Sequence, residues 1–379
     1  MRAGFKAAGL AAVMLVLGAD RAAAQCDAAI DLGRGRINLH IPPSYDGRTP
    51  VPLVILLHGY TSSGAQTESY VRFAPLANEY GFVYAYPDGT RDFLGNRFWN
   101  ATDACCNFFG SGVNDSQYLL DLVNAIKRQC NIDPRRVHFV GHSNGGFMSY
   151  RMACDHSDVV ASIASLAGMT FENPNDCGPA EPVHVLHIHG TNDSVIFYPG
   201  GCLVSCYPGA VESAEQWASF AGCSLDPDLT SDPLDLDAGI SGNETLVAKY
   251  EASCDPRGSA ELWTIVGGEH SPNLSSSFSR LVVEWLLAHP KPGGCTGAER
   301  ISAANCRDKR GTNVLKVKLA DGQPGDTFRV TITGGASDGG TLNNRGKGSV
   351  RFRGVGSGGG QATATWGCGA TDQETYTCP

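Results

Sequence analysis

The chain has 379 residues, 42% of them apolar, and a formal net charge of −9 at neutral pH. This length suffices for one large and one small domain, and the composition is that of a globular protein rather than of a disordered or membrane-embedded one. Residues 295–379 carry an excess of basic side chains, so the negative charge is concentrated on residues 25–294. This strongly acidic part of the chain disfavours nucleic acid as its partner.

The first 24 residues have the pattern of a secretory signal peptide. Arg2 and Lys6 precede an apolar stretch, residues 7–19, and the alanines at 22–24 supply the small residues of a cleavage site. The apolar stretch is too short for a membrane span, and no later one approaches the roughly 20 residues that a span requires. We expect an exported protein, extracellular or periplasmic, with no membrane segment after signal removal.

All 14 cysteines follow this segment, and an even number in an exported protein indicates a disulfide framework. Local pairing is expected for Cys202 with Cys206, Cys223 with Cys254, Cys295 with Cys306, and Cys368 with Cys378, although the sequence leaves connectivity open. The adjacent Cys105 and Cys106 are expected to reach two different partners. The cysteines lack zinc spacing, so no metal site is expected.

Short apolar runs alternate with helical patterns in residues 25–289, which is typical of a mostly parallel sheet covered by helices. Strands are predicted at residues 52–57, 82–85, 137–140, 160–166, 183–188 and 262–266. Helices are predicted at residues 65–78, 116–128, 145–154, 210–221 and 278–288. Several of the strands are continuous apolar runs, as strands buried on both faces should be.

The pentapeptide Gly141-His142-Ser143-Asn144-Gly145 lies between a predicted strand and a predicted helix. A serine at such a turn is the nucleophile elbow of serine hydrolases, and its strained backbone requires small flanking residues. A second Gly-x-Ser-x-Gly, around Ser337, has no helix after it and is interpreted as a hairpin or loop. The context therefore favours Ser143 as the nucleophile.

A serine nucleophile needs an imidazole base, and the base needs a carboxylate. In α/β hydrolases the acid and then the histidine follow the serine along the chain. Asp193 and His270 each follow a predicted strand in that order, so we expect them to complete the triad. His289 is interpreted as the C-terminal cap of a helix, and the aspartates between residues 226 and 237 as part of a solvated loop.

The oxyanion of a tetrahedral intermediate needs two hydrogen-bond donors. We expect them to be the backbone N–H groups of Asn144, directly after the nucleophile, and of Tyr60, in the loop after the first central strand. Tyr60 and Trp99 are the aromatic residues expected to contact substrate, and a packing role for Trp99 stays open. This chemistry requires no cofactor and no metal.

The motifs His58-Gly59, Cys105-Cys106, Gly141 to Gly146, His189 to Asp193 and Gly267 to His270 together resemble the polyhydroxybutyrate depolymerase and feruloyl esterase group of secreted α/β hydrolases. The resemblance covers residues 30–288. It implies an α/β-hydrolase fold, the triad of Ser143, Asp193 and His270, and a polymeric ester substrate, either a polyester or a plant cell-wall polysaccharide ester.

One departure concerns the acyl preference. Tyr60-Thr61-Ser62 stands where depolymerase-like members often carry a cysteine, and a tyrosine there resembles polyester hydrolases of the cutinase type. A cutinase-like aromatic polyester hydrolase and an acetylxylan esterase are therefore alternatives. A serine peptidase and a non-catalytic polymer-binding protein are weaker ones.

Residues 290–294 have the composition of a linker, and alternating strands at residues 314–319, 328–333 and 349–353 follow it between Gly-rich turns. Residues 295–379 are therefore predicted to form a small disulfide-bonded, sandwich-like β module. Attachment to an insoluble polymer and a structural or sorting role are both open, because its aromatic residues suffice only for a core. We expect the mature protein to be a monomer.

Overall fold

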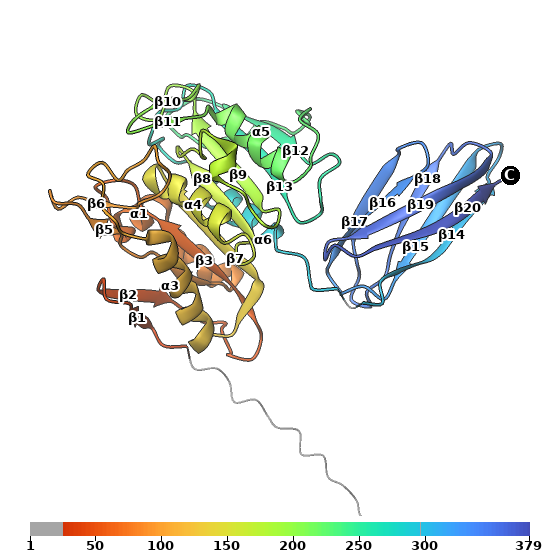
Figure 1. Ribbon diagram of the computed structural model, residues 1–379, viewed down its shortest axis with the longest axis horizontal. Helices are drawn as coiled ribbons and strands as arrows, with labels where there is room; N and C mark the ends of the chain where they lie inside the picture. Colours follow the sequence, from red (N-terminus) through yellow and green to blue (C-terminus); the bar gives the residue numbers. More distant parts are fainter. Residues whose placement is uncertain (1–25, 296) are drawn as a thin grey trace, which may run out of the picture.

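The computed structural model describes residues 26–295 and 297–379, which form two bodies joined by a short connection (Figure 1). The predicted signal peptide lies outside the described residues. The larger body contains a nine-stranded sheet. Its strands are β1 (Ala29–Asp31), β2 (Arg36–His40), β3 (Val51–Leu57), β4 (Val83–Ala85), β7 (Ile132–His142), β8 (Ser162–Leu166), β9 (His184–Gly190), β12 (Thr245–Tyr250) and β13 (Ser259–Ile265).

The strand order is β1-β2-β4-β3-β7-β8-β9-β13-β12. The strands from β4 to β13 in this order are parallel, while β1, β2 and β12 pair antiparallel at the two edges. Parallel strands end at the same edge of a sheet, so the loops after β3, β7, β9 and β13 gather there.

Helices cover both faces of this sheet, and each face has its own apolar core. One face carries α3 (Asp115–Gln129), α4 (Asn144–Asp155) and α5 (Ala210–Phe220), and the other carries α1 (Gly64–Val71), α2 (Ala74–Tyr80) and α6 (Phe278–Ala288). Successive strand side chains point to opposite faces, so Leu53 and Ile55 of β3 enter the first core and Val54 the second. The predicted α/β-hydrolase fold is confirmed.

The single helix predicted at residues 65–78 is wrong, because the chain forms α1 and α2 there. Arg72 ends α1 in the left-handed conformation, at φ 55°. The ring of Pro75 suits the first turn of a new helix but not a helix interior. The Glu68 carboxylate accepts hydrogen bonds from the N–H groups of Phe73 and Ala74, at 3.2 and 2.9 Å, and so caps the start of α2.

Two short hairpins lie within the loops at the carboxyl edge of the sheet. They are β5 (Thr90–Arg91) with β6 (Arg97–Phe98), and β10 (Gly201–Cys202) with β11 (Cys206–Tyr207); a 3₁₀ turn, η1, spans Pro174–Asp176. No helix in the described part of the chain is both long and apolar enough to span a bilayer.

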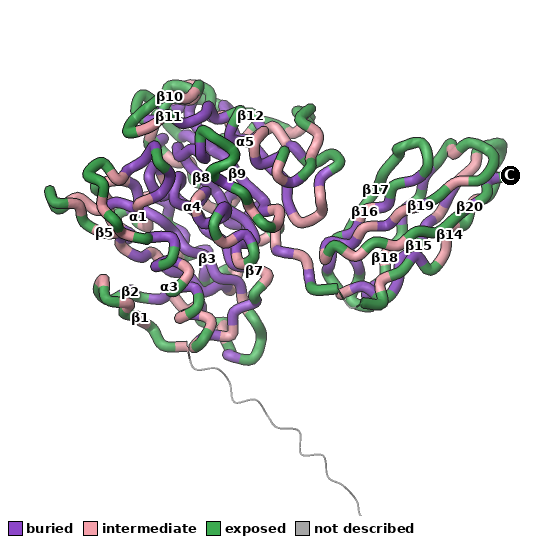
Figure 2. Tube along the Cα trace, viewed as in Figure 1, coloured by how far each residue is buried: buried purple, intermediate pink, exposed green. Residues whose placement is uncertain are grey.

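The smaller body is a sandwich of two antiparallel sheets. One contains β14 (Arg300–Asp308), β15 (Asn313–Ala320) and β18 (Gly348–Arg353), and the other β17 (Ser337–Thr341), β16 (Thr327–Ile332), β19 (Gly358–Trp366) and β20 (Thr371–Cys378). Between the sheets, Phe328, Phe352, Trp366 and Tyr376 are all buried in one apolar core. In the larger body, the central strands are mostly buried and the outer loops mostly exposed (Figure 2). Ser337 is exposed at the start of β17 in a hairpin with β16.

All described cysteines are paired, but not all as predicted. The expected bridges Cys202–Cys206 and Cys223–Cys254 are confirmed. The expected local pairs in the smaller body are wrong: the bridges there are Cys295–Cys368 and Cys306–Cys378. The sandwich brings β14 beside β20, so Cys306 meets Cys378, which is distant in sequence.

In the larger body, Cys105 pairs with its neighbour Cys106, contrary to the expectation of two different partners. Because the two cysteines close on each other, they do not tie this loop to other elements. The remaining bridges are Cys26–Cys130 and Cys154–Cys177.

Candidate active site

Ser143 sits between β7 and α4 in a backbone conformation that L-residues rarely adopt, with φ 55° and ψ −122°. The packing explains the glycines around it. A Cβ on Gly141 would lie 2.1 Å from the carbonyl oxygen of Gly145, and a Cβ on Gly145 would lie 2.1 Å from that of Leu57. Both distances are far below van der Waals contact, so the elbow closes only with glycine at each position.

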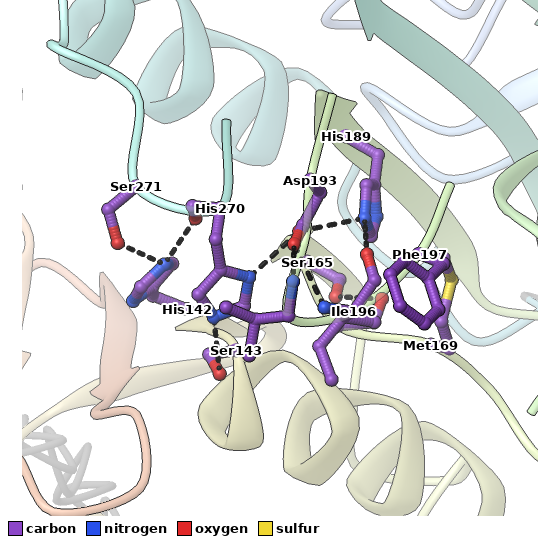
Figure 3. A network of polar contacts seen from close by, with 12 residues as sticks. His142, Ser143, Ser165, Met169, His189, Asp193, Ile196, Phe197, His270 and Ser271 are labelled. Carbon is purple, nitrogen blue, oxygen red and sulfur yellow. Dashed lines mark hydrogen bonds and ion pairs between the residues drawn. The ribbon is translucent and has the colours of Figure 1, made fainter. Parts of the chain in front are cut away.

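The structure brings Ser143, Asp193 and His270 together from three separate loops (Figure 3). His270 Nε2 lies 2.9 Å from Ser143 Oγ, and His270 Nδ1 lies 2.8 Å from Asp193 Oδ2. A carboxylate can only accept, so Nδ1 carries the proton, which leaves Nε2 free to accept from the serine hydroxyl. In this tautomer His270 can remove the proton of Ser143.

Asp193 is held by a set of donors beneath the site. Its Oδ1 accepts the N–H groups of Val195 and Ile196, each at 2.8 Å, and His189 Nε2 lies 3.1 Å from its Oδ2. Burial opposes the charged form of Asp193, but the hydrogen bonds from His189 and His270 outweigh it, so the pKa of this carboxyl lies well below its ordinary value. The acid is therefore charged at neutral pH.

Behind Asp193 lies a buried chain of hydrogen-bonded polar groups to which the sequence motifs give no role. His189 Nδ1 is 3.3 Å from His187 Nε2, and His187 Nδ1 is 2.7 Å from the hydroxyl of Tyr150. All three side chains are buried. The sequence could have indicated this chain, because His187 and His189 point to the same face of the central strand β9, and buried polar side chains need hydrogen-bond partners.

His142 lies next to His270, with ring centroids 5.1 Å apart. Its Nε2 donates to the carbonyl oxygen of His270 at 2.9 Å. Burial and the neighbouring His270 ring lower the pKa of His142 to about 4. His142 is thus neutral near pH 7 and adds no positive charge beside the base.

The predicted oxyanion donors flank Ser143. Within residues 26–295 and 297–379, the N–H groups of Tyr60 and Asn144 donate to no protein acceptor. A Cβ on Gly59 would lie 3.4 Å from the Ser143 Cβ, so the loop after β3 passes close to Ser143. His58 is structural as expected, because its ring bridges the carbonyl of Gly59 and the N–H of Gly89 at 2.7 and 2.8 Å.

A hollow of about 330 Å³ opens above Ser143. Its lining consists mostly of polar and aromatic side chains: Gly59, Tyr60, Ser62, Gln66, Thr67, Tyr70, His142, Ser143, His270 and Ser271. Tyr60 therefore lies where it was expected, at the surface of the site. Tyr70 was not predicted from the sequence.

Trp99 does not line this hollow. It is fully buried, and its indole N–H donates to the carbonyl of His58 at 3.1 Å. Its backbone N–H and carbonyl form paired hydrogen bonds with the Asn144 side-chain amide, at 2.7 and 3.0 Å. The structure thus places Trp99 behind the elbow, where it contacts Asn144 and the His58 loop.

Known proteins similar to this chain include several esterases. Feruloyl esterase B of Piromyces equi is 29% identical over 201 residues, 51% of this chain and 36% of that protein. The bifunctional acetylxylan esterase/xylanase XynS20E of Neocallimastix patriciarum is 30% identical over 169 residues, 44% of this chain and 22% of that protein. Poly(3-hydroxyalkanoate) depolymerase C of Paucimonas lemoignei is 31% identical over 138 residues, 35% of this chain and 31% of that protein.

The chain thus spans well under half the length of each of these relatives. A broader match covers residues 36–245, which hold β2 to β9, the elbow and Asp193. That match is to the family described as esterase PHB depolymerase. Because it covers more than half of the sequence, this protein belongs to the esterase PHB depolymerase family.

Proposed function

We propose that this protein is an exported serine esterase that hydrolyses carboxylic esters of a polymer or of its oligomers. The main support is the hydrogen-bonded series from Asp193 through His270 to Ser143. This series ends at a surface hollow that a substrate can enter. The disulfide density fits export, since such bridges persist in oxidising compartments.

The geometry supports acyl transfer in two steps. Ser143 Oγ attacks the ester carbonyl while His270 Nε2 takes its proton, and the N–H groups of Tyr60 and Asn144 stabilise the oxyanion. His270 then returns the proton to the leaving alcohol as the tetrahedral intermediate collapses to an acyl-enzyme. In the second step His270 deprotonates water, which attacks the acyl carbonyl, and the acid departs as Ser143 regains its proton.

Two surfaces next to the hollow suit a polysaccharide ester with an aromatic acyl group. Tyr60 packs edge-on against Phe108 at 5.0 Å, and the exposed Phe109 and Phe93 continue this aromatic surface at 4.3 Å from each other. Tyr70 leads to a second hollow of about 640 Å³. That hollow is lined largely by hydroxyl, amide and guanidinium groups, from Ser69, Arg72, Asn273, Ser275, Ser276, Ser279 and Arg280. Such groups hydrogen-bond sugars.

A hydroxyalkanoate polyester is the second candidate substrate, because the exposed aromatic surface continues into aliphatic residues. Leu94 is 63% exposed beside Phe93, and the exposed Val195 and Phe197 follow the catalytic Asp193. Monomeric proteins rarely gather exposed apolar groups without a partner for them. A panel of methyl ferulate, acetylated xylan, hydroxybutyrate oligomers and an aromatic polyester separates these substrates.

The test of the mechanism is Ser143→Ala. We expect the variant to lose hydrolysis of a short p-nitrophenyl ester by about 10⁴-fold or more, because no other group replaces the nucleophile. Its melting temperature should stay that of the native protein, and it should no longer react with a fluorophosphonate probe. Undiminished turnover or labelling in the variant rules out Ser143 as the nucleophile.

A further inference from the structure

The outer face of the three-stranded sheet in the smaller body is cationic. Burial alternates along β15 and β18, so Lys316 and Lys318 of β15 and Arg351 and Arg353 of β18 face away from the core. Arg307 of β14 lies opposite Val314, which is on the same outward side. These five basic side chains thus share one face of one sheet.

The pairing within this face works against the stability of the sheet. Lys316 lies directly opposite Arg351 in the β15–β18 ladder, and Arg353 and Lys318 are the next outward residues on the two strands. Like charges at directly opposed positions are destabilising. Within the described residues these four side chains have no ion-pair partner. A face that keeps such a repulsion is suited to a ligand that supplies the missing negative charge.

One end of the face is hollowed, with a volume of about 700 Å³. Lysines and hydrogen-bonding groups line it: Arg300, Ser302, Lys316, Lys318, Leu319, Ala320, Asp321, Thr341, Asn343, Lys347, Gly348 and Ser349. Asp321 supplies the carboxylate in this lining, and it forms an ion pair with Arg300 at 2.9 Å. The hollow can take a chain that carries both hydroxyl and carboxylate groups.

The exposed residues of the smaller body and the charge of the larger body restrict which polyanion could bind this face. Within residues 297–379 no large apolar side chain is exposed, and the aromatic residues fill the core. The smaller body therefore offers no aromatic platform for bases or for a polyester, and no apolar group to enter a membrane. The acidic larger body repels double-stranded nucleic acid, which carries about one charge per 1.7 Å, more strongly than a polysaccharide that carries at most one charge per sugar.

We propose that the outer face of β14, β15 and β18 binds an acidic polysaccharide, whose uronate carboxylates pair with Lys316, Lys318, Arg351 and Arg353. The choice of a polysaccharide rests on the proposed esterase function, since both bodies then engage one polymer. Tethering the catalytic body to its substrate chain raises the local concentration of ester groups.

The test is affinity electrophoresis of the full chain carrying Ser143→Ala, through gels that contain polygalacturonate or the same polymer with its carboxyls methyl-esterified. We expect retardation by the charged polymer only, and its loss as added salt screens the charges. Combining K316E with K318E should weaken binding by about tenfold or more, because each change replaces an attraction by a repulsion. R48E makes a similar change on an exposed residue of the larger body and should leave binding unchanged.

K316E alone separates a binding role from a structural one. It places a carboxylate opposite Arg351, so we expect weaker polymer binding together with an equal or higher melting temperature. Equal retardation of native and K316E/K318E proteins overturns the proposal, as does equal retardation by the methyl-esterified polymer. Stronger binding to anionic lipid vesicles or DNA also overturns it. Because the tested chain lacks the nucleophile, these outcomes do not depend on the catalytic assignment.

Discussion

At Asp193 the structure adds a fourth side chain to the three that the sequence predicted. His189 Nε2 lies 2.8 Å from the carbonyl oxygen of Ile196 and 3.1 Å from Asp193 Oδ2. A carbonyl oxygen only accepts, so Nε2 carries a proton and also donates to the carboxylate. His189 is fully buried and absent from the lining of the hollow. It therefore acts as a positioning residue for Asp193.

His189→Phe should lower kcat by about tenfold or more and leave KM nearly unchanged, because a hydrogen bond to a charged group is lost away from the substrate. Steady-state kinetics on a p-nitrophenyl ester measures both constants. His189→Gln keeps an N–H donor and should recover much of the loss. A purely structural role predicts instead that both variants lose melting temperature in proportion to activity.

At the scale of elements, the elbow is a three-way contact between β3, β7 and α4. The Gly145 Cα faces the backbone of β3, where an added Cβ would lie 2.1 Å from Leu57 O and 2.8 Å from His58 O. Leu57 ends β3 and pairs with Gly141 of β7, and the His58 carbonyl, just beyond β3, accepts the Trp99 indole N–H. Neither carbonyl can therefore turn away without breaking these contacts. The glycines that made the motif recognisable are thus explained by strand packing.

Gly145→Ala should destabilise the protein by about 1–3 kcal/mol, as overpacked sites do, and should also lower activity because β3 carries the Tyr60 loop. Urea denaturation and ester hydrolysis measure the two effects. Gly178→Ala is the matched control, since a Cβ at Gly178 would meet nothing within 4 Å. Equal stability of the two variants contradicts the packing explanation.

At the scale of the whole molecule, the larger body holds several histidines neutral in its interior. Burial lowers the pKa of His138 to about 3 and that of His142 to about 4, and it places the pKa values of His184 and His187 well below the ordinary value. Between these values and the ordinary value of 6.5, the unfolded chain binds more protons than the folded one. Folding stability must therefore fall as pH falls through that window.

We expect the larger body to lose stability steadily from about pH 6.5 to pH 5, with each such histidine contributing about 1.4 kcal/mol per pH unit. Calorimetry at a series of pH values measures this. Residues 295–379 contain no histidine, so any separate transition of the smaller body should change little over the same range. A larger body whose melting temperature stays constant there contradicts the prediction.

The sequence alone determined the features that local residues encode. The continuous apolar runs predicted the central strands, and α6 has the predicted bounds because its apolar stripe is strictly helical. The motif order was enough to predict that Ser143, Asp193 and His270 lie together. By contrast, β17 was not predictable: its sequence, Ser337–Thr341, has no apolar residue and lies fully exposed, and pairing with β16 makes it a strand.

Only the tertiary structure decided which distant residues meet. It joined Cys306 to Cys378 across the sandwich, buried Trp99 behind the elbow, and brought His189 beneath Asp193. It also aligned Lys316 with Arg351 on one face. These contacts depend on strand order and register, which bring together segments that no local pattern links. The three residues proposed for catalysis were thus predictable from the chain, while the residues that hold them and the proposed binding face depend on the fold.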